Sequence, residues 1–189
     1  MSTTEKMSSR ELGLLLAQQL LDVEDLHYGL WESDLDLTLG NLAIAQQRYS
    51  DLLLDTAAGL LAHLPRPRIL DVGCGTGHLA AQMLSRGWEV TAVSPSRALA
   101  DLARQRLADF PDSQARLLED RFEDLESHRL GKFDLMLFSE SFQYIPLPVL
   151  FDKLPELLSP DSCLLLSFFF KTAVHGDGQP VEQSFVGGD

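Results

Sequence analysis

The chain is short of cysteine and of long apolar runs, and each shortage excludes a class of protein. Cys74 and Cys163 are the only cysteines among its 189 residues, so neither a disulfide framework nor a thiolate metal site is expected. The longest apolar runs, such as 163–170, are far too short to span a bilayer. The first ten residues are polar, and no hydrophobic signal segment follows them. We therefore expect a reducing, cytoplasmic location without a membrane span.

Basic residues are also scarce. The chain has 28 acidic residues against 15 basic ones, which gives a net charge of −13. Affinity for nucleic acid depends on the neutralisation of phosphates by clustered basic side chains. Here they are scattered: Arg97, Arg104 and Arg106 share one helical pattern with Asp101 and Asp109, which is typical of a solvated face. We therefore expect no nucleic-acid partner.

What the sequence does contain is an alternation of strand and helix patterns, which predicts an α/β protein built around a parallel sheet with right-handed crossovers. The length suits one domain with a sizeable core. The expected strands are 69–72, 89–93, 115–118, 133–138 and 163–170, and the expected helices between them are 78–85, 98–110 and 149–158.

The region before the first strand carries a helical pattern at 10–22 and one or two further helices at 42–62, ended by two prolines. We expect three parts, which are an N-terminal helical lid, a core and a flexible tail rich in glycine and polar residues. They cover 1–64, 65–174 and 175–189.

The turn after the first strand is the strongest functional signal. The strand pattern ends on Asp71, and Gly73, Gly75 and Gly77 follow at alternate positions before a helix begins. Glycine tolerates a positive φ and lets a ligand approach the main chain closely, and the helix aims its first N–H groups at that ligand. This pattern predicts a nucleoside or nucleotide site at the carboxyl edge of the sheet. Cys74 has no cationic neighbour in the sequence, so we interpret it as a small packing residue of the turn rather than a reactive thiol.

Residues 70–77, which read LDVGCGTG, resemble motif I of class I S-adenosylmethionine-dependent methyltransferases, and the resemblance covers roughly 65–171. It implies a Rossmann-like α/β/α sandwich that uses S-adenosyl-L-methionine to methylate O, N or C of a small molecule, which we expect to be a natural product, a lipid or a quinone-like compound. In this family the turn residues 73–77 pack against the methionine part and the ribose of the cofactor. The carboxylate at Asp71 helps to hold the turn and the amino end of the ligand.

The resemblance places further cofactor contacts after the next strands. The family has an acidic residue for the ribose hydroxyls where this chain has Ser94, so weaker cofactor binding is expected. Asp120 or Arg121 would meet the adenine edge, with Phe122 supplying an N–H or an apolar wall. Alternatively, the acidic residues within 119–124 only form the solvated first turn of a helix. Ser139, at the end of the fourth strand, would lie beside the transferring methyl group.

Residues that face the methyl acceptor are expected just after the fourth strand. No histidine falls there, so Glu140 and Tyr144 are the acid/base candidates, although they can equally be a cap and a wall residue. An N-terminal aromatic segment around Tyr28 is similar to one in natural-product and lipid methyltransferases, where a tyrosine contacts the cofactor. Tyr28 and Tyr49 are the candidates here, unless Tyr28 and Trp31 only pin the N-terminal helices to the core.

Two other functions stay open. Ser94 and Arg97 would suit the 2′-phosphate of NADP in an oxidoreductase domain. The glycine spacing fits that less well, because His78 and Leu79 follow Gly77 where a nicotinamide fold has its third glycine. The second alternative is a non-catalytic methyltransferase-like binding module. No metal-ligand spacing is present, so no metal is expected.

The end of the sequence bears on assembly. The family closes its sheet with a further helix and two strands, the last of them antiparallel. Residues 171–189 are too few for those elements, so we expect these C-terminal strands to be missing. An uncovered strand edge invites pairing with another chain. We therefore expect either a piece of a longer protein or a chain whose sheet edge is completed by a partner, as in a homodimer formed through that edge.

Overall fold

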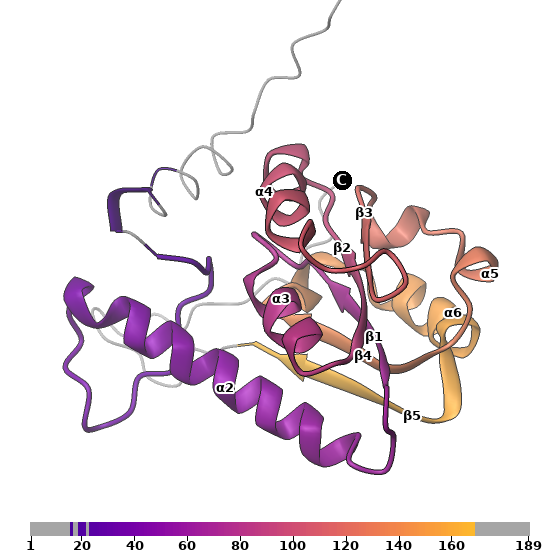
Figure 1. Cartoon of the computed structure of the whole chain (residues 1–189), viewed down its shortest axis with the longest axis horizontal. Helices are drawn as coiled ribbons and strands as arrows, with labels where there is room; N and C mark the ends of the chain where they lie inside the picture. Colours follow the sequence, from indigo (N-terminus) through magenta and orange to yellow (C-terminus); the bar gives the residue numbers. More distant parts are fainter. Residues whose placement is uncertain (1–15, 17–18, 22, 169–189) are drawn as a thin grey trace, which may run out of the picture.

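The computed structural model describes residues 16, 19–21 and 23–168, and at its centre lies a five-stranded parallel sheet (Figure 1). The strand order is β3-β2-β1-β4-β5. Most of the predicted helix 10–22 and the whole predicted tail 175–189 lie outside the described residues. The strands are β1 (Arg68–Val72), β2 (Glu89–Val93), β3 (Ala115–Leu118), β4 (Phe133–Ser139) and β5 (Leu158–Ser167).

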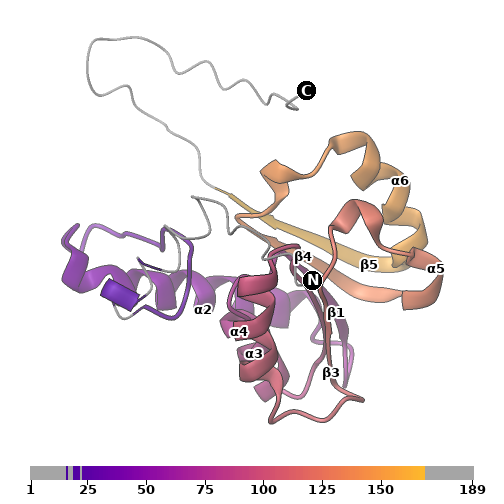
Figure 2. The same ribbon diagram turned by 90° about the horizontal axis from the view of Figure 1, so that it is seen from above.

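Helices cover both faces of the sheet, as the predicted α/β/α sandwich requires (Figure 2). Side chains of α2 (Leu42–Leu60), α3 (His78–Ser85) and α4 (Arg97–Leu107) pack on one face. Those of α5 (Ser127–Leu130) and α6 (Leu147–Leu157) pack on the other. The Rossmann-like fold expected from the sequence is confirmed.

The inner strands are apolar almost throughout because both of their faces are buried. In β4, Leu135 and Leu137 belong to the core beneath α2 and α3, while Met136 and Phe138 belong to the core beneath α5 and α6. Successive side chains of a strand point to opposite faces, so one apolar run supplies both cores.

The helix before the first strand is part of this sandwich. A single 19-residue helix, α2, forms where one or two helices were expected. Its buried Tyr49, Leu53, Leu54 and Ala57 share a core with β1 and β4. This part of the predicted lid 1–64 is therefore a layer of the core domain.

Several element ends differ from the sequence prediction, most clearly those of α4 and β5. Helix α4 ends at Leu107 instead of 110, and a turn closed by the 3.1 Å bond from the N–H of Phe110 to the carbonyl oxygen of Leu107 leads to Pro111, which disfavours helical geometry at the residue before it. Strand β5 begins at Leu158 instead of 163, through an irregular pairing with β4. There Ser162 Oγ donates to the carbonyl oxygen of Phe133 at 2.6 Å, so a polar stretch joins the sheet.

The residues that the structure describes include no helix long and apolar enough to cross a membrane. They also include no group of three or more His, Cys, Asp or Glu side chains placed to hold a metal ion.

Candidate functional site

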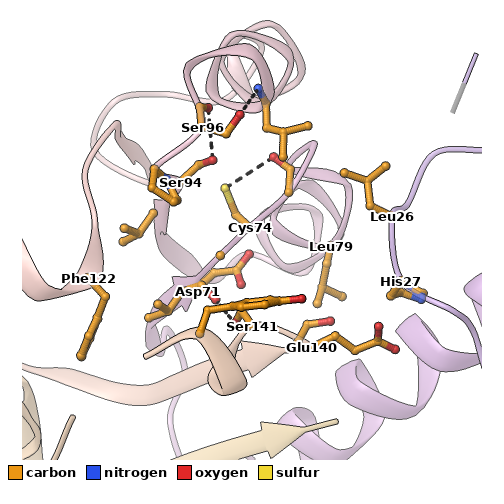
Figure 3. A pocket seen from close by; sticks show the side chains of 18 of the residues that line it. Leu26, His27, Asp71, Cys74, Leu79, Ser94, Ser96, Phe122, Glu140 and Ser141 are labelled. Carbon is orange, nitrogen blue, oxygen red and sulfur yellow. Dashed lines mark hydrogen bonds between the residues drawn. The ribbon is translucent and has the colours of Figure 1, made fainter. Parts of the chain in front are cut away.

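A cavity of about 990 Å³ opens at the carboxyl ends of β1, β2 and β4 (Figure 3). Its walls come from the glycine turn, the start of α4, the loop after β3, the end of β4 and the N-terminal segment 25–28. The strand order reverses between β1 and β4, and open α/β sheets bind their ligands at such a point. The structure therefore brings together segments that are far apart in the sequence.

The glycine turn needs its glycines for two physical reasons. Gly73, Gly75 and Gly77 all have a positive φ, of 81°, 57° and 77°. A Cβ on Gly73 would lie 2.5 Å from the Cβ of Ser141, and a Cβ on Gly77 would lie 3.0 Å from Ala103. Backbone conformation and close packing therefore both exclude a side chain at positions 73 and 77.

Cys74 is held in the turn by its backbone. Its N–H donates to the carbonyl oxygen of Val93 at 3.0 Å, beside the 2.9 Å bond from the N–H of Gly73 to the same oxygen. Burial, followed by the charge of Asp71, raises the pKa of the Cys74 thiol well above its ordinary value. The thiol therefore stays protonated, as expected for a packing residue.

Asp71 is the last-but-one residue of β1, and it is only 1% exposed. Neither of its carboxylate oxygens has a hydrogen-bond partner in the described part of the chain. Burial, and then the charge of Asp25, raises the pKa of Asp71 to about 7. A buried carboxylate without partners is costly, so the site is built for a ligand that brings a cation or hydrogen-bond donors.

The N-terminal segment is tied to this turn. Thr76 Oγ1 donates to the carbonyl oxygen of Glu24 at 2.7 Å, and Arg106 Nη1 donates to the same hydroxyl at 2.9 Å. Gln46 Nε2, from α2, donates to the carbonyl oxygens of Asp25 and His27 at 3.1 Å and 2.6 Å. These bonds hold the segment against the cavity.

The structure brings Asp25 and His27 into the cavity wall beside the predicted Tyr28. Neither residue was predicted from the sequence, where acid/base candidates were expected only after the fourth strand. Their position within three residues of Tyr28, a predicted cofactor contact, is the feature of the sequence that could have indicated them. Tyr49 is not among the residues lining the cavity, but its hydroxyl and Ser139 Oγ, which does line it, are 3.2 Å apart.

Glu140 lines the cavity in an unusual backbone conformation. Its φ of 52° is the only positive value for a non-glycine residue in the described part of the chain. The N–H of Glu140 donates to the carbonyl oxygen of Ser167 at 2.8 Å, and the carbonyl oxygen of Glu140 accepts a 2.7 Å bond from Gln143 Nε2. Burial raises the pKa of its carboxyl, while His27 and the N–H of Tyr28 act in the opposite direction. Strain of this kind is common at functional sites.

The remaining predicted residues divide between the cavity wall and the surface. Ser94 is buried and lines the cavity, with its Oγ donating to the carbonyl oxygen of Ser96 at 3.4 Å. Arg121, Phe122 and the 53% exposed Tyr144 also line it. Asp120 is exposed and lies outside the lining residues.

The charge of the cavity is predominantly negative. Four carboxylates line it, from Asp25, Asp71, Glu123 and Glu140. Arg121 is the arginine that lines the cavity, and its Nη2 is 3.0 Å from a carboxylate oxygen of Glu123. The charge of Arg121 is therefore balanced by that of Glu123. Such a cavity favours a cationic or neutral ligand over an anionic one.

Comparison with known proteins supports this description. Residues 70–164, half of the chain, match the family profile described as a methyltransferase domain. Ubiquinone biosynthesis O-methyltransferase of Xanthomonas campestris pv. campestris (strain B100) is 33% identical over 120 residues, which are 63% of this chain and 49% of that protein. Magnesium-protoporphyrin O-methyltransferase of Rhodobacter capsulatus is 29% identical over 128 residues, 60% of this chain and 56% of that protein. The chain thus spans about half the length of these curated relatives.

Solved structures share the fold. A geranyl diphosphate C-methyltransferase from Streptomyces coelicolor A3(2) aligns with a TM-score of 0.57 at 21% identity, over 76% of this chain and 55% of that one. A glycopeptide N-methyltransferase aligns with a TM-score of 0.51 at 24% identity, over 62% and 53% of the two chains. The chain therefore belongs to the methyltransferase domain family, with the Rossmann-like fold of class I S-adenosylmethionine-dependent methyltransferases.

Proposed function

We propose that this protein binds S-adenosyl-L-methionine and transfers its methyl group to a small-molecule acceptor. The single observation that carries the proposal is the buried carboxylate of Asp71, which has no partner beside the glycine turn. An α-ammonium group supplies the cation and the donors that this carboxylate needs. The family membership and the O-methyltransferase names of two curated relatives support methyl transfer, with oxygen as the favoured acceptor atom.

The lining residues fit this cofactor. The carboxylates of Asp25 and Asp71 suit a ligand that carries both an ammonium and a sulfonium charge. The glycine turn leaves room for close approach of a nucleoside, and Ser94 lies where its ribose hydroxyls would meet a hydrogen-bond partner. When bound, the cofactor supplies an electrophilic methyl group, so the protein's task is to align the acceptor and to exclude water.

The NADP alternative is less well supported. Arg97, which it needs for the 2′-phosphate, is exposed and lies outside the residues that line the cavity. The predominantly negative lining of the cavity also disfavours a phosphate. We therefore retain S-adenosylmethionine as the proposed cofactor.

A radiochemical assay separates an enzyme from a binding module. The full chain is incubated with S-adenosyl-L-methionine labelled in its methyl group and a panel of phenols, quinols and amines. We expect label in at least one acceptor, and at cofactor concentrations near the wild-type Kd we expect Asp71→Asn to lower it strongly while the exposed Asp36→Asn does not. Cofactor binding without transfer to any acceptor would instead favour the non-catalytic module.

Assembly and location complete the proposal. Among the described residues, β5 forms one edge of the sheet, which supports the predicted homodimer. A monodisperse monomer in light scattering would contradict the dimer. The net charge of −13 supports the absence of a nucleic-acid partner, and the free thiols of Cys74 and Cys163 support a cytoplasmic location.

A further inference from the structure

We infer that His27, held by Asp25, is the base that takes the proton from a hydroxyl group on the methyl acceptor. The inference rests on the proposed function and deepens it, because it makes the acceptor a phenol- or enol-type alcohol. Neither residue was among the sites predicted from the sequence. Three features of His27 carry the inference: the place of its imidazole, the ring nitrogen that bears the hydrogen and the charges around the ring.

The imidazole is buried in the cavity wall at a fixed place. The side chain of His27 is 8% exposed, and His27 lines the cavity together with Glu140 (Figure 3). Its ring packs against that of Tyr49, with centroids 4.2 Å apart and planes inclined by 39°. The 2.6 Å bond from Gln46 Nε2 to its carbonyl oxygen fixes its backbone. The ring is therefore positioned by the fold before any ligand arrives.

The hydrogen-bond pattern assigns the tautomer. Nε2 of His27 is 3.5 Å from Asp25 Oδ2 and 3.4 Å from Ser50 Oγ. The hydroxyl of Ser50 itself donates to Asp25 Oδ2, at 3.4 Å, so both oxygens present lone pairs to Nε2. Nε2 must then carry the hydrogen, which leaves the lone pair of the neutral ring on Nδ1.

Nδ1 is the atom that lacks a partner. It is buried, and no described residue forms a hydrogen bond with it. Buried polar atoms are nearly always hydrogen-bonded, and this one belongs to a ring that lines a ligand cavity. A lone pair accepts a donor, so the missing partner is a donor group of the ligand, and the hydroxyl of the acceptor can fill this place whereas a carbonyl or a phosphate oxygen cannot.

The proposed step couples transfer of the methyl group to transfer of the hydroxyl proton. The acceptor oxygen forms a bond to the methyl carbon, and the bond from that carbon to sulfur breaks with its electron pair left on sulfur. The hydroxyl proton moves to Nδ1 of His27. The positive charge of the sulfonium thus passes to the imidazolium, whose Nε2 is 3.5 Å from Asp25 Oδ2 and whose charge also acts on Glu140. Proton transfer by a positioned side chain contributes roughly 10²- to 10⁴-fold in rate.

The titratable and polar groups around this ring come from four segments of the chain. Asp25 belongs to the same N-terminal segment, and Glu140 follows β4. Tyr49 and Ser50 come from α2, and Nε2 of His78, in α3, is 3.9 Å from Asp25 Oδ2. Asp25 and Glu140 are therefore the negative charges nearest to the ring that takes the proton.

The first test reads the tautomer without any turnover. Long-range nitrogen–hydrogen NMR of the full chain labelled with ¹⁵N-histidine locates the ring proton, and His27→Gln assigns the signals. We expect the proton on Nε2 at neutral pH, and we expect Asp25→Asn to weaken that preference. The exposed His63→Gln serves as the matched control. A proton on Nδ1 would overturn the inference.

The second test uses the phenol that the wild-type chain methylates in the radiochemical assay. We expect His27→Gln to lower kcat roughly 10²- to 10⁴-fold, with KM for S-adenosylmethionine unchanged. The lost rate should return as the pH approaches the pKa of the phenol, which then ionises by itself. Asp25→Asn, which keeps the ring, should cause a smaller loss.

An unchanged kcat in His27→Gln, or a loss that high pH does not restore, overturns the inference. Methylation of amines alone by the wild-type chain also overturns it. Failure of the wild-type chain to bind S-adenosylmethionine overturns the proposed function instead. The two failures are therefore distinguishable.

Discussion

A Cβ atom on Gly73 would lie 2.5 Å from the Cβ of Ser141, so these two positions can adjoin only because one of them is glycine. Ser141 follows β4, and its Oγ donates to the carbonyl oxygen of Val72 at the end of β1. The contact thus joins the ends of two neighbouring strands directly beneath the cavity. The shape of the site therefore depends on the missing side chain at position 73.

Gly73→Ala should destabilise the protein. Alanine at a φ of 81° is strained, and its methyl group would overlap Ser141. Together these effects should lower the free energy of unfolding by about 2–5 kcal/mol. Urea unfolding followed by circular dichroism measures it. Gly59→Ala is the matched control, because a Cβ there meets nothing within 4 Å. It should stabilise α2 by up to about 1 kcal/mol. Equal effects of the two substitutions would contradict this account.

Asp71 should make the unliganded protein less stable as the pH rises. Its pKa is raised from 3.8 to about 7 on folding, so within that window the folded state holds a proton that the unfolded state has released. The stability that this group contributes is fully present below pH 3.8 and is lost as the pH rises through 7.

Asp71→Asn should therefore stabilise the unliganded protein above pH 7, by on the order of 4 kcal/mol, and should have little effect near the unfolded-state pKa. Thermal unfolding across pH measures the difference. Asp134→Asn should do the opposite, because Asp134 Oδ2 accepts a 2.7 Å hydrogen bond from the N–H of Arg68. A destabilised Asp71→Asn protein above pH 7 would mean that the carboxylate has partners.

Ser94→Asp should strengthen cofactor binding. Ser94 lies at the end of β2 in the cavity wall, where a carboxylate can accept hydrogen bonds from both ribose hydroxyls. A charged hydrogen bond is worth about 1.5–3 kcal/mol, so the Kd for S-adenosylmethionine should fall roughly 10- to 150-fold. The uncharged Ser94→Asn should gain less. A higher Kd for the aspartate variant than for the wild-type protein would show that Ser94 does not face the ribose.

Thr76→Val should loosen the N-terminal segment. The substitution removes the 2.7 Å bond to the carbonyl oxygen of Glu24 and the 2.9 Å bond from Arg106. We expect a loss of about 1–3 kcal/mol in stability and about tenfold in cofactor affinity. Thr76→Ser, which keeps the hydroxyl, should restore both. Proteolysis of 24–28 monitored by mass spectrometry reports the loosening independently.

The sequence predicted the strands, the glycine turn and the helices around it, because these depend on local periodicity and on glycine chemistry. It did not predict that Asp25 and His27 reach the cavity. Their place is set by long-range bonds, such as those from Gln46 and Thr76, that no local pattern encodes. The start of β5 was also wrong, because Ser162 joins the sheet through an irregular pairing with β4. Local rules thus predicted the glycine turn that lines the cavity and missed Asp25 and His27.

The most direct test of the central claim is a calorimetric titration of the full chain with S-adenosyl-L-methionine and with NADPH. The account predicts that S-adenosylmethionine binds the wild-type protein and that NADPH does not. It also predicts that Asp71→Asn weakens the binding of S-adenosylmethionine roughly 10- to 150-fold, the equivalent of one charged hydrogen bond. Binding of NADPH alone, or an Asp71→Asn protein with wild-type affinity for S-adenosylmethionine, would contradict it.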